Sequence, residues 1–224
     1  MNAPTPLLIL NAGDPHSAEM AEIVERVNRV SPTWDLLGYV SSDPSHAEQM
    51  LNGYPVHDEA ILARRPDARV VANEYGWHAP AEVPRERYAT LVDPSAFVSR
   101  TATVGTGCVV FPHCFVGFDA RIGDHVFCLS GAVVNHDALI DDRVTLCARA
   151  TLAGAVRVEP DCYLGQGCQI RQSVRVGRNS LIGMGAVVLR DVDADSVMVG
   201  NPARRLRART PRPPGDGDAP GTTE

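Results

Sequence analysis

Residues 91–192 repeat with a period of six, and this period constrains the fold more than any other feature of the chain. Every sixth residue from Val92 to Val188 is aliphatic, with Cys128 as the exception. A second series, four residues after each of these anchors, contains only Ala, Val, Cys and Ser. The repeat runs through 17 hexads without an insertion.

A period of six matches neither an α-helix, which repeats every 3.6 residues, nor a plain alternating strand. Short strands separated by regular corners satisfy it, with one large and one small residue of each strand pointing inward. Such a chain winds into a parallel β-helix whose coils stack about 4.8 Å apart. The narrow interior of this fold accounts for an aromatic content of only 5%.

Five of the six cysteines lie on the two inward series, where a buried thiol acts as a small apolar side chain. They are Cys108, Cys114, Cys128, Cys162 and Cys168. Cys147 directly follows an anchor and is expected nearer the surface, without a paired base that would make it a nucleophile. Reduced cysteines, together with an N-terminus lacking the pattern of a signal peptide, predict a cytoplasmic protein.

The hexads resemble the left-handed β-helix of the hexapeptide-repeat acyltransferases, in which three hexads form one triangular coil. The stretches 133–137 (VVNHD) and 199–204 (VGNPAR) are similar to one branch of that family. This branch holds the sialic-acid O-acetyltransferases and the N-acetyltransferases of nucleotide-linked amino sugars. The resemblance implies a homotrimer with acetyl-CoA as acyl donor. It also implies that neighbouring subunits cover outer residues such as Phe111, Phe115 and Leu129.

The resemblance divides the chain into three parts. Residues 1–88 are expected to form a small α/β, Rossmann-like domain that binds substrate. Residues 89–206 form the all-β, left-handed parallel β-helix. Residues 207–224, rich in proline and glycine, are expected to be a disordered tail.

The N-terminal part shows the apolar and capping patterns of an α/β unit. Residues 7–10, 36–40 and 69–72 predict strands, and Asp14-Pro15 predicts the start of a helix. By the same reasoning, residues 43–53 predict a second helix that begins at Asp43-Pro44 and ends at Gly53.

The turn after the first strand carries Asn11 and Gly13, the expected substrate-binding residues. The branch has several glycines there, which let the backbone approach a phosphate. This chain has one glycine followed by Asp14, whose charge repels a phosphate unless the carboxylate only caps the helix. Nucleotide binding and a purely structural turn both remain open.

The resemblance makes His136 the general base and Asp137 its partner. Acetyl transfer to an amine needs a group that removes a proton, and histidine titrates near neutrality. Gly154 lies three hexads further, where the absence of a side chain leaves room beside His136 and its N–H can hold the thioester oxygen. A glycine required at a corner with positive φ is the competing explanation for this residue.

Cofactor contacts of the family map by spacing onto Thr145, Gly154 and Met184. Gly165 and Gly183 leave a smooth column above Cys147 that a pantetheine arm could follow. Arg149 and the arginines from Arg204 to Arg209 could pair with CoA phosphates or lie in solvent.

Several classes of function are excluded or disfavoured. The formal net charge of −6 argues against nucleic acid or an anionic membrane as partner. All 21 basic residues are arginine, so lysine chemistry is absent. The spacings between His113, His125 and His136 do not match a coil of three hexads, so these side chains cannot stack and no metal is expected.

The sequence therefore predicts an acetyl-CoA-dependent N-acetyltransferase of an amino sugar, which the resemblance implies is nucleotide-linked. O-acetylation of a sialic-acid-like sugar is the first alternative, because the same base can act on a hydroxyl. A non-catalytic β-helix scaffold is the second.

Overall fold

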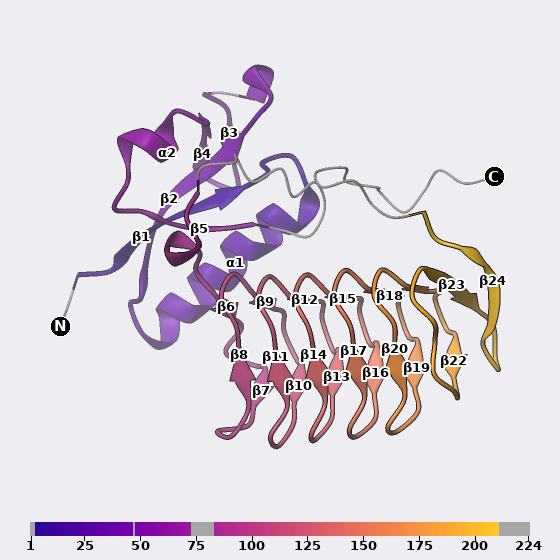
Figure 1. Cartoon of the computed structure of the whole chain (residues 1–224). Coiled ribbons are helices and arrows are strands. Elements are labelled where there is room, and N and C mark those ends of the chain that lie inside the picture. The colour runs from indigo at the N-terminus through magenta and orange to yellow at the C-terminus, as the bar shows by residue number, and fades with distance from the viewer. Residues whose placement is uncertain (1–2, 47, 73–82, 211–224) are drawn as a thin grey trace. The chain divides into compact units, whose positions relative to one another are not determined.

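The computed structural model describes residues 3–46, 48–72 and 83–210. The chain divides into two compact units, one ending at Leu91 and the other beginning at Val92. The first unit is a mixed α/β structure and the second is a parallel β-helix (Figure 1).

The N-terminal unit is built on a five-stranded sheet with the order β3-β4-β2-β1-β5. Its strands are β1 (Thr5–Leu10), β2 (Trp34–Ser41), β3 (Met50–Leu51), β4 (Tyr54–Asp58) and β5 (Arg69–Val71). β1 pairs in parallel with β2 and β5, and β2 pairs in parallel with β4, which confirms the three strands expected here.

Helix α1 (Pro15–Val30) contacts β1 and β2 through Met20, Ile23 and Val24, which are almost completely buried. Asp14 caps this helix, since its carboxylate accepts a hydrogen bond of 2.8 Å from the backbone N–H of His16. A second apolar cluster joins Leu8 and Leu10 of β1 to α2 (Ile61–Arg64) and to Tyr88, which follows the short 3₁₀ turn η2 (Arg85–Arg87).

The prediction of a helix over residues 43–53 is wrong. Only a 3₁₀ turn, η1 (Pro44–His46), forms there, and the antiparallel pair β3–β4 follows. Asn52 and Gly53 connect these strands with φ values of 48° and 82°. Two successive positive φ values are typical of a type I′ hairpin turn, for which Asn-Gly is the preferred pair. The sequence reasoning treated Gly53 as a helix end and missed this pair.

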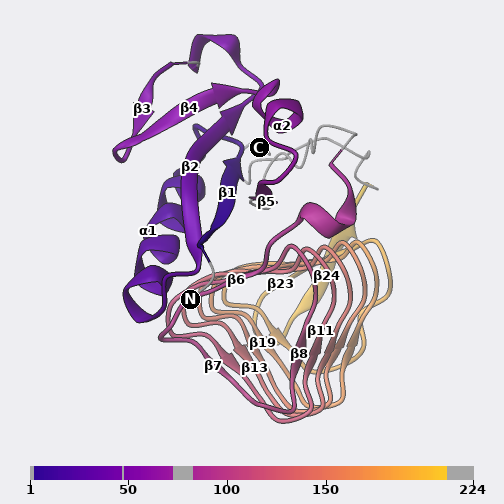
Figure 2. The same cartoon turned by 90° about the vertical axis from the view of Figure 1, so that its left-hand side faces the viewer.

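The β-helix has three flat faces, which Figure 2 shows in a view nearly along its axis. We call them the first, second and third faces in the order in which the chain meets them. Each strand is only two residues long over most of the β-helix, because a corner recurs every six residues.

The first face has the order β24-β23-β21-β18-β15-β12-β9-β6. Its strands are β6 (Leu91–Val92), β9 (Val109–Val110), β12 (Phe127–Cys128), β15 (Thr145–Leu146), β18 (Tyr163–Leu164), β21 (Leu181–Ile182), β23 (Ser196–Val199) and β24 (Arg204–Ala208).

The second face contains β7 (Phe97–Val98), β10 (Phe115–Val116), β13 (Val133–Val134), β16 (Thr151–Leu152), β19 (Gln169–Ile170) and β22 (Val187–Val188). The third face contains β8 (Thr103–Val104), β11 (Arg121–Ile122), β14 (Leu139–Ile140), β17 (Arg157–Val158) and β20 (Arg175–Val176).

Consecutive coils pair in parallel with an offset of three hexads, as the repeat predicts. Val116, for example, pairs with Val98 on one side and Val134 on the other. The inward residues from Cys108 to Val192 are buried, including the five cysteines expected in the interior, whereas those of the first coil are partly exposed.

The corners share one backbone conformation. A residue with φ between 49° and 75° occurs at every sixth position from Gly107 to Gly185, three residues after each inward anchor. In one coil this residue is Asp137, and one coil later it is Ala155 rather than Gly154. A positive φ therefore does not explain why residue 154 is glycine.

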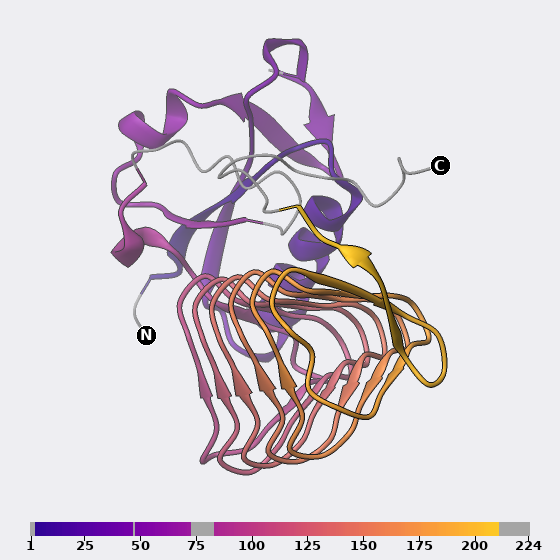
Figure 3. The same ribbon diagram turned by 45° about the vertical axis from the view of Figure 1, so that its right-hand side comes forward.

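The β-helix ends in the antiparallel pair β23–β24, visible at its C-terminal end in Figure 3. β24 continues to Ala208, so residues 207 and 208 belong to a strand and not to the tail expected from residue 207. The tail from 211 to 224 lies outside the described residues. Among the residues that the structure describes, no helix is long and apolar enough to cross a membrane.

Candidate functional site

His136 and Asp137 occupy the corner that follows β13, between the second and third faces. Asp137 adopts φ 59°, and its Oδ2 lies 2.8 Å from His136 Nδ1. An ionised carboxylate can only accept a hydrogen bond, so Nδ1 is the donor, and in the neutral form of the ring Nε2 is the acceptor. The two side chains are 55% and 58% exposed, which leaves Nε2 within reach of a substrate.

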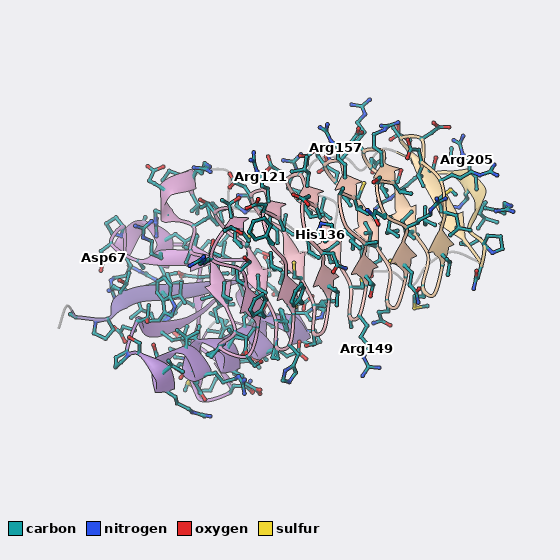
Figure 4. The ribbon with its side chains drawn as sticks, turned by 90° about the horizontal axis from the view of Figure 1, so that it is seen from below. Asp67, Arg121, His136, Arg149, Arg157 and Arg205 are labelled. Atoms are coloured by element: carbon teal, nitrogen blue, oxygen red, sulfur yellow. The ribbon has the colours of Figure 1, made fainter. Side chains whose placement is uncertain are left out.

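The corner is fixed by bonds to the next coil. Asn135 donates from its side-chain amide to the carbonyl of Leu152 at 2.8 Å, and Ala155 N–H donates to the carbonyl of His136 at 2.9 Å. These bonds hold the backbone on both sides of the imidazole. In Figure 4 His136 lies midway along the β-helix, with Arg121 and Arg157 along one edge and Arg149 extending from the other.

Gly154 lies beside the imidazole, as its spacing of one coil from His136 predicts. A Cβ atom at residue 154 would be 2.4 Å from Cε1 and 2.5 Å from Nε2 of His136. Any side chain here would displace the ring, so glycine is required by the close approach of His136.

Thr145 and Met184 are not brought to His136 within one chain. Thr145 lies in β15 on the first face and is only 4% exposed. Met184 follows β21 at the corner between the first and second faces and is 75% exposed. Their role as cofactor contacts stays a prediction.

Cys147 is 1% exposed, so the expectation that it lies nearer the surface is wrong. Phe111 and Leu129, expected on the outer surface, are likewise buried within the chain, whereas Phe115 is 38% exposed. The position in a hexad indicates whether a side chain points away from the axis, but not what packs over it.

Gly165 and Gly183 hold the same position as Cys147 in the next two coils, and the three residues form one column along the β-helix. A Cβ at Gly165 would be 2.7 Å from the carbonyl oxygen of Ile182, and one at Gly183 would be 3.0 Å from a methyl carbon of Val199. Close packing between coils therefore accounts for both glycines, and it leaves bare backbone along this corner.

The N-terminal turn forms a separate group of residues. Asn11 and Gly13 have φ values of 63° and 103°, and a Cβ at Gly13 would be 3.2 Å from Cε1 of His46. His46 Nδ1 lies 3.1 Å from the Ser41 hydroxyl. Nothing in the sequence pattern indicates that His46 approaches this turn.

Sequence reasoning also missed Phe118, which precedes His136 by one coil and is 58% exposed. The signal was available in the spacing of three hexads between the two residues. Within the described ranges, no group of three or more His, Cys, Asp or Glu side chains is arranged to hold a metal ion.

Comparison with known families identifies residues 155–190 as a hexapeptide repeat of the succinyl-transferase type. The chain is 34% identical over 68 residues to a 2,3,4,5-tetrahydropyridine-2,6-dicarboxylate N-acetyltransferase from Staphylococcus aureus. That match covers 27% of this chain, and the chain spans only 28% of the length of this curated relative.

Solved structures match over most of the chain. The acetyltransferase domain of PglB from Neisseria gonorrhoeae has a TM-score of 0.77 at 25% identity, covering 90% of this chain and all of that domain. A histidine mutant of GDP-perosamine N-acetyltransferase from Caulobacter crescentus, in complex with CoA and GDP-perosamine, has the same TM-score and identity over 90% of this chain and 97% of that one.

Proposed function

We propose that this chain, a hexapeptide-repeat protein of the nucleotide-amino-sugar acetyltransferase branch, transfers an acetyl group from acetyl-CoA to an amino group of a nucleotide-linked sugar. The proposal includes the left-handed β-helix, the Rossmann-like domain and the homotrimer of that branch. One observation carries it. His136 is oriented by Asp137, lies against a residue without a side chain, and has a side chain that is 55% exposed.

In the proposed reaction, the amine nitrogen attacks the thioester carbonyl while His136 Nε2 accepts the proton that the amine loses. The new C–N bond forms, the C–S bond breaks, and the imidazolium returns its proton to the departing thiolate. Asp137 holds the ring and stabilises its cationic form, while the backbone N–H of Gly154 is the donor assigned to the thioester oxygen.

The relatives support the choice of an amine over a hydroxyl. The Caulobacter enzyme was solved with CoA and GDP-perosamine, and both it and the Staphylococcus relative are named as N-acetyltransferases. A hydroxyl acceptor would use the same base, so O-acetylation of a sialic-acid-like sugar is the alternative that the assay must separate.

We assign Asn11 and Gly13 to the nucleotide of the acceptor. Both residues have positive φ and lie in the turn that follows the end of β1. Asp14 already occupies the cap of α1, since its carboxylate accepts the His16 N–H. A phosphate would meet that negative charge, so contacts with the base or ribose suit this turn better than contacts with the diphosphate.

The test is an acetyl-CoA consumption assay with nucleotide sugars that carry either an amino group or a hydroxyl at the same carbon. Turnover of the amino sugar alone supports the proposal, and turnover of the hydroxy sugar alone establishes the O-acetyltransferase. His136→Ala should lower kcat by about 10²- to 10⁴-fold, the usual contribution of a general base.

His113→Ala is the matched control, because His113 lies at a corner of the same β-helix and has a positive φ similar to that of Asp137. Full turnover by His136→Ala would show that His136 is not the general base. If millimolar acetyl-CoA fails to raise the Tm of the parent protein and no acceptor is acetylated, the chain is a scaffold.

A further inference from the structure

All five phenylalanines of the chain lie between residues 97 and 127, on the N-terminal side of His136. Phe111 and Phe127 are buried and contact each other with ring centroids 5.2 Å apart. Phe97, Phe115 and Phe118 are instead 55%, 38% and 58% exposed. We call these three residues the phenylalanine surface.

Phe118 is the member that lies at the corner of His136. The Asp137 N–H donates to the Phe118 carbonyl at 2.9 Å, just as the Ala155 N–H donates to the His136 carbonyl one coil later. Phe118, His136 and Gly154 therefore occupy equivalent positions in three successive coils, about 4.8 Å apart.

The other two rings extend this surface across the second face. Phe97 and Phe115 pair in register on β7 and β10, and their rings stack with centroids 5.0 Å apart and an interplanar angle of 13°. A Cβ at Gly117 would be 3.2 Å from the Phe115 ring and 2.9 Å from the backbone nitrogen of His136. Gly117 thus lets the Phe115 ring approach the backbone that carries the base.

The two sides of His136 consequently differ in chemistry. Toward the N-terminal coils lie exposed aromatic rings, and toward the C-terminal coils lies the bare backbone of Gly154. A reaction between two substrates needs both of them at Nε2 of His136. The glycine side offers a backbone donor for a thioester, whereas the aromatic side offers apolar contact area.

We propose that Phe118 contacts the acceptor sugar and selects acceptors whose ring presents a C–H face rather than a hydroxyl at that place. This inference rests on the proposed function. The Phe118 ring lies one coil from the assigned base and is more than half exposed. It therefore offers apolar area that the described part of the chain leaves largely uncovered. A sugar covers such a ring well because its C–H groups form apolar patches.

The physical reason for selection is desolvation. A hydroxyl pressed against the Phe118 ring loses its hydrogen bond to water and finds no acceptor on the ring. An apolar pocket rejects a substrate that carries one additional hydroxyl by up to about 10²-fold. Phe118 should therefore act on the kcat/KM for the acceptor and leave the KM for acetyl-CoA unchanged.

The experiment measures kcat/KM for two nucleotide amino sugars that differ by one hydroxyl on the sugar, with the parent and with Phe118→Ala, Phe118→Leu and Phe118→Tyr. Leu139→Ala is the matched control, since Leu139 is an exposed apolar residue on the third face. We expect Phe118→Ala to lose at least tenfold in kcat/KM for the less hydroxylated acceptor and to narrow the preference between the two. Phe118→Tyr keeps the ring, so it should retain most of the kcat/KM and most of the preference between the two acceptors.

Three outcomes overturn the inference. An unchanged preference in Phe118→Ala, with the parent active, removes Phe118 from the acceptor site while the proposed function stands. A change of molecular mass in light scattering for Phe118→Ala, absent for Leu139→Ala, shows that a second copy of the chain covers the ring. If the parent acetylates neither acceptor, the proposed function is wrong, and the inference that rests on it is wrong as well.

Discussion

The imidazole of His136 lies directly against the α carbon of Gly154 in the next coil. A Cβ atom added at residue 154 would stand 2.4 Å from Cε1, which no side-chain contact allows. The histidine assigned as the base therefore has its ring position set from two directions, by the Asp137 carboxylate at 2.8 Å and by a glycine that yields space.

Gly154→Ala should abolish this arrangement without unfolding the β-helix. The new methyl group displaces the ring from its place at the corner, so we expect kcat to fall by about 10²-fold, typical of a misplaced catalytic group. The measurement is a steady-state assay beside a thermal melt.

Gly131→Ala is the control for that change, because it adds the same methyl at another corner, where the nearest atom is 3.5 Å away. Gly131 has positive φ, but residues other than glycine hold the equivalent position in most coils, so the variant should fold. Equal activity of Gly154→Ala and the parent would contradict the role of the close approach.

Asp137→Asn tests the partner of the base. The amide cannot stabilise a cationic imidazole as a carboxylate does, so kcat should fall by about 10- to 100-fold, less than on removal of the base itself. Asparagine tolerates the positive φ of this corner, and the Tm should stay unchanged. A steady-state assay and a thermal melt measure the two quantities.

Asp119→Asn serves as the matched control for that change. Asp119 has φ 53° and holds the same corner position one coil earlier, but it follows Phe118 rather than a histidine. A loss in Asp119→Asn as large as in Asp137→Asn would mean that the effect comes from the corner and not from the histidine.

The hexads predicted the coil length, the inward residues and the place of His136, because a repeat of this kind leaves little choice of register. Val116, pairing with Val98 and Val134, lies where the spacing requires. Gly154 was also placed correctly beside His136.

The features that the sequence did not predict share a physical cause, because each depends on contacts between residues at more than one position of the chain. The burial of Cys147 depends on what packs over its column, and the type I′ turn at Asn52-Gly53 depends on two residues adopting positive φ together. The Phe97–Phe115 stack needs two coils in register, so no single hexad indicates it. The site likewise could be predicted only as far as His136 and its neighbours in the same column.

A ladder of carboxylates along the corner after the third face should stabilise the fold. Asp142 Oδ1 accepts the Asp124 N–H at 2.8 Å, and Asp124 Oδ1 accepts the Thr106 N–H at the same distance. Asp142→Ala leaves one amide without its charged acceptor and should lower the free energy of unfolding by about 1–3 kcal/mol. Asp141→Ala, which removes only a 3.5 Å ion pair with the exposed Arg157, should cost less than about 1 kcal/mol. Urea unfolding measures the free energy of unfolding of both variants. Equal decreases in the two variants would contradict a stabilising role for the carboxylate ladder.

The buried thiols should make the protein lose stability in alkaline solution. Burial raises the pKa of Cys108, Cys162 and Cys168 to about 12, whereas an unfolded thiol titrates near its ordinary value. Above about pH 9 the unfolded chain releases these protons and the folded chain keeps them. The free energy of unfolding therefore falls as pH rises, by up to about 1.4 kcal/mol per pH unit for each thiol.

Cys168→Ala isolates one of these contributions. Alanine is common at the same inward position of other coils, so the variant should fold and differ little from the parent at pH 7. Between pH 9 and 11 its free energy of unfolding should decline less steeply than that of the parent, because one fewer proton is released on unfolding. Urea titrations at pH 7, 9, 10 and 11 measure the two slopes. Parallel slopes would show that Cys168 keeps an ordinary pKa in the folded chain, and that the interior of the β-helix is more hydrated than its burial implies.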